Sequence, residues 1–146
     1  MKKIVIGLVL GLTMIALIAM PAFATTQRVQ MYTNGDGVTV RPGCYATFIT
    51  DQGDNTLTVL ATVKGARPKA QYEVLLVVDT VSYSFGNITT SSKGTWGGQN
   101  QQREFEKVLP AGTHNVTLRL LNPSDVIATD LYNQVVVTIT PQNSQR

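Results

Sequence analysis

The residues best suited to chemistry are few and lie far apart in the sequence. The chain has one histidine, His114, and one cysteine, Cys44. A nucleophile activated by histidine would therefore have to use His114, with either a serine or the thiol of Cys44. Zinc needs several converging histidine, cysteine or carboxylate ligands, and one of each does not supply them. Because His114 follows the turn at Pro110 and begins a predicted strand, we predict that it is structural and that the chain is not an enzyme.

The carboxylates give no stronger sign of catalysis. Glu104 and Glu106 point to the same side of a strand, as a pair that cleaves glycosides could. Phe105 lies between them, so alternation places both glutamates in solvent, where charges also protect a sheet edge. Asp51 and Asp54 lie in a glycine-bearing turn without the alternating ligands of a calcium loop, and Asx turns explain them. We therefore expect no catalytic residue, no metal and no cofactor.

Three aromatic residues, Trp96, Tyr83 and Phe85, are the candidate ligand-binding residues. They lie in or near residues 91–102, a stretch rich in Ser, Gly, Gln and Asn. Aromatic faces could stack on sugar rings while the amides bond to hydroxyl groups. Alternatively, Tyr83 and Phe85 belong to the core face of a strand and Trp96 covers an open sheet edge. Large aromatic side chains mostly serve cores, so packing is the favoured interpretation.

The first 24 residues predict an export signal. Lys2 and Lys3 precede an apolar run over residues 4–20, and Ala22-Phe23-Ala24 has the small-x-small form of a cleavage site. An uncleaved anchor is the rival interpretation, since about 20 apolar residues span a bilayer. Cleavage would leave a secreted or extracellular chain of the cell envelope that starts near Thr25 and has no membrane span.

The net charge and the cysteine content limit the classes of binding partner and the possible disulfides. The formal net charge is +3, and removing Lys2 and Lys3 lowers it to +1. The remaining lysines and arginines are scattered along the sequence, which predicts neither a nucleic acid nor an anionic membrane as partner. We expect an unknown protein or polysaccharide at the cell exterior. Cys44 cannot form an internal disulfide, so it is either a buried small hydrophobe or a free thiol.

The elements that must position these residues are predicted to be strands. No segment after residue 24 shows helical periodicity, and short alternating runs are separated by Gly, Pro, Asn and Asp turns. Residues 56–64 form the clearest half-buried strand. Residues 72–78 form the most apolar one, entered through a turn at Gly65 and Pro68. Because both faces of this second strand are apolar, we expect it to be central and covered on both sides.

The chain is therefore predicted to be all-β, with one antiparallel β-sandwich of seven or eight strands over residues 37–140. Residues 25–36 are a polar N-terminal arm, or else a first edge strand. Residues 141–146 are a polar tail.

Two segments share one pattern, Pro68-x-x-x-Tyr72-x-Val74-x-Leu76 and Pro110-x-x-x-His114-x-Val116-x-Leu118. In each, a proline turn brings a ring side chain to the start of a strand. The first segment resembles the x-P-x-x-x-Y-x-V of fibronectin type III and immunoglobulin-like sandwiches, where the tyrosine closes a corner by bonding to backbone. Over residues 55–140 the chain also looks like a common pattern in exported prokaryotic proteins. Fibronectin type III domains have this tyrosine late, whereas here half the domain follows Tyr72, and the immunoglobulin cysteine pair is missing.

The resemblance implies a fold and leaves the activity open. We expect a non-enzymatic exported β-sandwich that serves as a structural or protein-interaction module at the cell exterior. The alternative is a carbohydrate-binding module that uses Trp96 and Tyr83.

Overall fold

The computed structural model describes residues 25–51, 53–97 and 103–140. The predicted signal peptide (1–24), the predicted tail (141–146) and part of the Gly- and Gln-rich stretch lie outside the described residues. Within those ranges the regular elements are strands, and no helix there is long and apolar enough to cross a bilayer. The strands are β1 (Thr25–Thr33), β2 (Val40–Asp51), β3 (Thr56–Thr62), β4 (Gln71–Val78), β5 (Val81–Thr89), β6 (Phe105–Val108), β7 (Gly112–Asn122), β8 (Asp125–Thr129) and β9 (Val135–Ile139).

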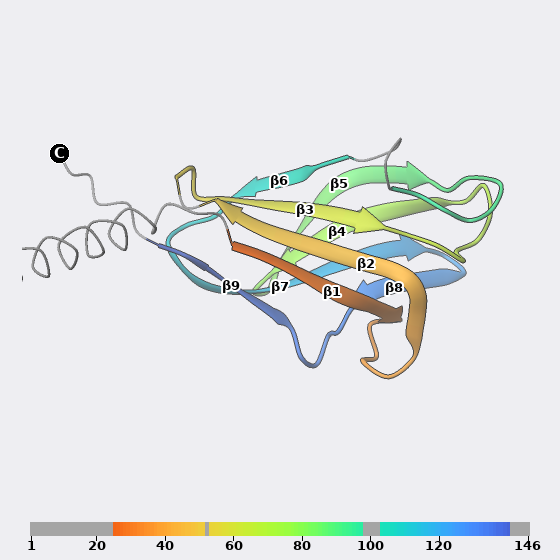
Figure 1. Cartoon of the computed structure of the whole chain (residues 1–146), viewed down its shortest axis with the longest axis horizontal. Coiled ribbons are helices and arrows are strands. Elements are labelled where there is room, and N and C mark those ends of the chain that lie inside the picture. Colours follow the sequence, from red (N-terminus) through yellow and green to blue (C-terminus); the bar gives the residue numbers. More distant parts are fainter. Residues whose placement is uncertain (1–24, 52, 98–102, 141–146) are drawn as a thin grey trace, which may run out of the picture.

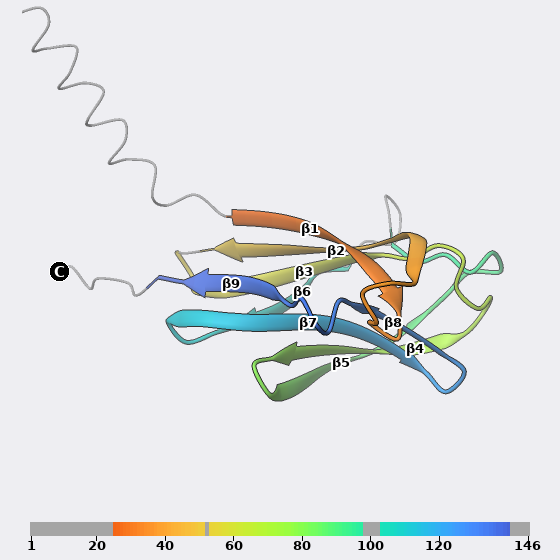
Figure 2. The same cartoon turned by 90° about the horizontal axis from the view of Figure 1, so that it is seen from below.

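All strand pairs are antiparallel, as predicted, and they form one sheet in the order β5-β4-β7-β8-β1-β2-β3-β6. The long strand β7 pairs with β9 along its first half and with β8 along its second half. The sheet folds back on itself, so that β1, β2 and β3 face β4, β5 and β7 across the core (Figures 1 and 2). Strand β8 links the two layers because it pairs with both β7 and β1.

The described chain has nine strands where we predicted seven or eight, and β1 accounts for part of the difference. Residues 25–36, for which an arm and an edge strand were both considered, contain a strand that pairs with β2. Its last residues also pair with β8. Met31 is fully buried and Val29 packs against the core. The polar composition conceals this strand because only its second half faces the interior.

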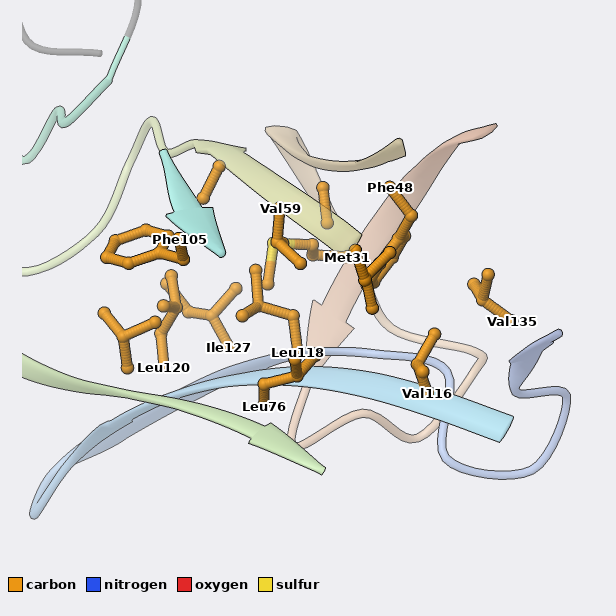
Figure 3. Packing of buried hydrophobic residues seen from close by; sticks show 14 of the residues in the cluster. Met31, Phe48, Val59, Leu76, Phe105, Val116, Leu118, Leu120, Ile127 and Val135 are labelled. Atoms are coloured by element: carbon orange, nitrogen blue, oxygen red, sulfur yellow. The ribbon is translucent and has the colours of Figure 1, made fainter. Parts of the chain in front are cut away.

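Alternate residues of the strands fill the space between the two layers (Figure 3). Strand β3 follows its predicted pattern, with Leu57, Val59 and Ala61 buried. Cys44 is buried in the same cluster. The largest fully buried side chains come from every strand except β5 and include Met31, Phe48, Leu57, Tyr72, Leu76, Phe105, Leu118, Leu120, Ile127 and Ile139.

Strand β4 lies between β5 and β7, so it is internal to the sheet as predicted. Its inner face is buried through Tyr72, Val74, Leu76 and Val78. The expectation that its other face is also covered was wrong, because Glu73, Leu75 and Val77 on that face are only half-buried. Neighbouring side chains of the same sheet partly bury this face, and no second layer of described residues packs over it.

Candidate functional site

Tyr72 closes the corner before β4 in the way that the sequence pattern predicted. The backbone N–H of Arg67 donates to the Tyr72 hydroxyl at 3.2 Å. The hydroxyl in turn donates to Asp125 Oδ2 at 2.5 Å. Arg41 then binds the same carboxylate through both of its terminal nitrogens, at 2.7 and 3.1 Å. One phenol therefore ties the start of β4 to the beginnings of β2 and β8.

The charges of this network are fixed by their surroundings. Burial first, and then the hydrogen bond to Asp125, raise the pKa of Tyr72 to about 12, so the phenol remains a donor at ordinary pH. Burial raises the pKa of Asp125, but hydrogen bonds from Arg41 and Tyr72 outweigh it and hold that pKa below its usual value. The carboxylate therefore stays ionised between a cation and a phenol, and these contacts stabilise the fold.

His114 closes a second corner before β7. Its Nδ1 lies 2.9 Å from Asp79 Oδ2, and its Nε2 lies 2.8 Å from the carbonyl oxygen of Pro110. Both neighbours are acceptors, so only the protonated imidazolium can donate to both. The contact with Asp79, followed by that with Pro110, raises the pKa of His114 accordingly. With both nitrogens occupied and the residue buried, His114 has no nitrogen left to act as a general base.

The two corners are arranged reciprocally. Strands β4 and β7 are antiparallel neighbours, so their starting corners lie at opposite ends of the pair. Tyr72 at the start of β4 bonds to Asp125, which lies just beyond the end of β7. His114 at the start of β7 bonds to Asp79, which lies just beyond the end of β4. The repeated sequence pattern is therefore one corner geometry used twice.

Cys44 does not meet the requirements of a nucleophile. Its thiol is fully buried and donates to the carbonyl oxygen of Lys64 at 3.2 Å. Burial raises the pKa of the Cys44 thiol, which lowers the fraction of thiolate at neutral pH. The Cys44 thiol bonds to Lys64, whereas the His114 ring bonds to Asp79 and Pro110, so the structure does not join the two side chains into a pair.

Trp96 is not available to stack on a sugar. The residue is 8% exposed, and its ring stacks on Phe105 with centroids 6.0 Å apart. Its backbone exchanges two hydrogen bonds with Val63, at 2.8 and 3.0 Å, which fixes it beside the end of β3. Stacking on a sugar would need an exposed indole face, and Trp96 does not present one in this position. The packing interpretation of Trp96 fits instead.

Tyr83 and Phe85 lie at the seam where β5 approaches β6. The Phe85 and Phe105 rings pack with centroids 5.3 Å apart, and Arg103 Nη2 donates to the Phe85 carbonyl oxygen at 3.0 Å. Lys107 Nζ lies 4.0 Å from the centre of the Tyr83 ring, so a cation of the chain already occupies one aromatic face. Both residues are partly buried. These aromatics join the two layers through side chains where no backbone ladder does.

The remaining predicted carboxylates do not form a site. Glu104 and Glu106 are exposed, as their alternation with Phe105 indicated. Asp51 accepts a hydrogen bond from the backbone of Gly53 two residues on, which is the Asx-type contact that was expected. Among the described residues, no three histidine, cysteine, aspartate or glutamate side chains come together in a way that could hold a metal ion.

Among the described residues, a groove of about 330 Å³ lies between β1 and the segment that joins β8 to β9. Residues 25–30 of β1 have a ladder partner on one side, β2, and the groove opens on the other side. Gln27 Nε2 crosses towards β9 and donates to the Val136 carbonyl oxygen at 2.9 Å. The groove is lined by Val29, Gln30 and Tyr32 of β1, by Thr129 of β8, and by Asp130, Asn133 and Val135.

Polar groups at the groove are firmly placed. Asp130 accepts hydrogen bonds from the backbone N–H groups of Tyr132 and Asn133, and these lower the pKa of its carboxyl. Gln30 Nε2 lies within 3.0 Å of three backbone carbonyl oxygens, including those of Arg41 and Cys44. The groove therefore has an open strand edge, an ionised carboxylate and an apolar floor. No local sequence pattern indicates this groove, since its lining residues come from two segments about 100 positions apart, 29–32 and 129–135.

No protein-family model, no curated protein and no solved structure matches the chain. Within the described residues the fold itself defines the protein: a single antiparallel sheet folded into two facing layers, with corners closed by Tyr72 and His114 and a groove beside β1.

Proposed function

We propose that the chain is a non-enzymatic, exported β-sandwich of the immunoglobulin and fibronectin type III kind that serves as a structural or protein-interaction module at the cell exterior. Immunoglobulin-like sandwiches place strands A, B and E in one sheet and C, F and G in the other. Assigning β2, β3 and β6 to A, B and E, and β4, β7 and β8 to C, F and G, keeps both the chain order and the strand neighbours. In this assignment β5 is C′, β1 is an added strand, and β9 lies beside β8 along strand F, since both pair with β7.

The corner before β7 supports the same assignment. In immunoglobulin-like domains the tyrosine corner lies near the start of strand F and bonds to backbone a few residues upstream. Here His114 lies at the start of β7 and bonds to the carbonyl of Pro110, four residues upstream. Tyr72 adds a second corner before β4. This chain would then keep the corner at F with a histidine and repeat it at C with a tyrosine.

A non-enzymatic role is supported by the hydrogen bonds of the potentially reactive side chains, which are all structural. His114 has both ring nitrogens engaged, and the Cys44 thiol is buried on the Lys64 carbonyl. The ionised carboxylates of Asp125 and Asp79 hold corners. These groups stabilise the fold, and a substrate would have to break those contacts to reach them.

The observation that carries an interaction role is the open edge of β1 beside the groove. An exposed strand edge with an adjacent pocket is the arrangement by which many domains bind an extended segment of a partner, with backbone giving affinity and pockets giving selectivity. Cleavage after Ala24 would make Thr25, the first residue of β1, the N-terminus of the exported chain. The open edge of β1 would then begin at the N-terminus of the exported chain, and the partner could pair with it from Thr25 onward.

The test is recovery of a partner from the cell envelope with matched variants. Asn133 is exposed and lines the groove, so Asn133→Arg would obstruct it while keeping the backbone contact to Asp130. Ser82→Arg places the same side chain on exposed β5, away from the groove. We expect the wild type and Ser82→Arg to recover the same partner and Asn133→Arg to lose it. Equal recovery by all three, or none by the wild type, would contradict the proposal.

A further inference from the structure

Four cations from two segments of the sequence come together at one end of the molecule. Lys64, Arg67 and Lys69 lie in the loop between β3 and β4, and Lys93 lies in the segment after β5. All four side chains are exposed. Together they are called the basic end. The sequence-based expectation of scattered charge missed it, because the two segments are adjacent only in the folded chain.

Backbone hydrogen bonds hold the two segments of the basic end against each other. The N–H of Ala66 donates to the Gly94 carbonyl at 3.0 Å, and the N–H of Lys69 donates to the Ser91 carbonyl at 2.9 Å. The Thr90 hydroxyl donates to the Arg67 carbonyl at 2.5 Å. These bonds place the cations on a rigid surface, which reduces the entropy that a ligand must remove on binding.

Glycine is required where these two segments touch. Gly94 has a φ of 74°, and a Cβ at this position would overlap the carbonyl oxygen of Ala66. The close approach of the segments, and with it the spacing of Lys93 from the other three cations, therefore depends on a residue without a side chain.

The positive charge of the basic end is not neutralised within the described part of the chain. Lys64, Arg67, Lys69 and Lys93 make no ion pair there, where the ion pairs are Arg41–Asp125 and His114–Asp79. Asp125 is the nearby carboxylate, and Arg41 and Tyr72 already occupy its oxygens. Arg67 acts on Asp125 only at longer range, so the four cations keep a local positive field that attracts a polyanion. This field is local, since the net charge without residues 1–24 is only +1.

We propose that the basic end binds an anionic polysaccharide, that is, a sugar polymer with carboxylate, phosphate or sulfate groups along its length. A membrane surface fits less well, since none of the exposed large apolar residues lies in the loops of the basic end, whereas interfacial binding uses apolar side chains beside the cations. Single-stranded nucleic acid needs exposed aromatic rings for its bases, and Trp96, the aromatic residue of these loops, is buried. A polysaccharide needs only spaced cations and hydrogen-bond donors.

This inference takes the exterior location from the proposed function, but it uses a different surface. The groove lies between β1 and the β8–β9 segment, whereas the basic end is formed by loops that leave β3 and β5. Binding by the purified chain does not depend on where the cell places it. A failure of polysaccharide binding would therefore leave the groove experiment with Asn133→Arg unaffected, and the reverse also holds.

The experiment measures binding of the purified full-length chain to polygalacturonate by titration calorimetry at low and moderate salt, with neutral dextran as the blank. Lys69→Gln with Lys93→Gln removes two cations of the basic end. Arg28→Gln with Lys107→Gln is the charge-matched control, since these cations lie over the rings of Tyr45 and Tyr83 elsewhere in the fold. Circular dichroism confirms that both double variants fold.

We expect the first double variant to bind roughly two- to thirtyfold more weakly, from two contacts of the strength of surface ion pairs. The control should bind like the wild type, and binding should weaken as salt is added. Absence of binding by the wild type, or equal loss in both variants, would overturn the proposal. Tighter binding to phosphatidylserine vesicles or to a single-stranded oligonucleotide than to polygalacturonate would also overturn it.

Discussion

Replacing Tyr72 with phenylalanine isolates the hydroxyl that closes the corner before β4. The ring is fully buried and would keep its packing, because phenylalanine has nearly the same shape. The substitution removes the bond to Asp125 at 2.5 Å and leaves the Arg67 N–H without its acceptor at 3.2 Å. Asp125 would keep its two contacts with Arg41.

The expected cost follows from these two bonds. A hydrogen bond to a charged group contributes about 1.5–3 kcal/mol and a neutral one about 0.5–1.5 kcal/mol. Part of the loss is offset because the Tyr72 hydroxyl no longer has to be desolvated. We therefore expect Tyr72→Phe to lower the free energy of unfolding by about 2–3 kcal/mol. For a domain of this size, that corresponds to a fall in Tm of roughly 8–12 °C.

The assay is urea unfolding at pH 7, followed by the fluorescence of Trp96. Tyr132→Phe is the matched control, because Tyr132 is 80% exposed and should change the stability by less than about 0.5 kcal/mol. Asp125→Asn, alone and combined with Tyr72→Phe, tests whether the two side chains are coupled. A Tyr72→Phe protein as stable as the Tyr132→Phe control would refute the role of the corner.

Three further predictions concern the rest of the fold. Since contacts with Asp79 and Pro110 raise the pKa of folded His114 above its ordinary 6.5, the imidazolium stabilises the fold fully below that pH. This stabilisation is lost as pH rises through the folded pKa, so the gap in stability between wild type and His114→Gln should narrow from pH 6 to pH 9 in urea titrations, and a widening gap would contradict it. Leu76→Ala should cost about 2–5 kcal/mol in the same assay because Leu76 is fully buried; a cost below about 1 kcal/mol would make β4 peripheral. Cys44 should react with a thiol reagent only after denaturation, and rapid reaction of the native chain would show that the thiol is accessible.

Much of the fold could be predicted from the sequence because its signals are local. Alternation along residues 56–63 identified the inner face of β3, and the proline followed by Tyr72 identified a corner closed on backbone. The repeated pattern at His114 predicted a second corner of the same kind, and the contact between the His114 ring and the Pro110 carbonyl fits that prediction. Hydrophobic alternation and turn-forming residues can both be recognised in a window of about ten residues, so a single sequence is enough to reveal them.

What the sequence did not reveal depends on contacts between distant segments. Asp125 bonds to Tyr72, 53 positions away, and Asp79 bonds to His114, 35 positions away, and no local pattern predicts either contact. The burial of Trp96 follows from its pairing with Val63, which no local pattern encodes. Strand β1 looked polar because its first residues are exposed and only its second half faces the interior.

The most direct test of the exterior interaction role is site-specific photo-cross-linking on intact cells. A photoreactive amino acid would replace Thr26, which is exposed on the open edge of β1, and Ser82 on β5 would serve as the control position. The account predicts that the mature chain at the cell exterior cross-links from position 26 to one defined partner protein, and that position 82 does not reach it. A chain retained inside the cell, or the same products from both positions, would contradict the account.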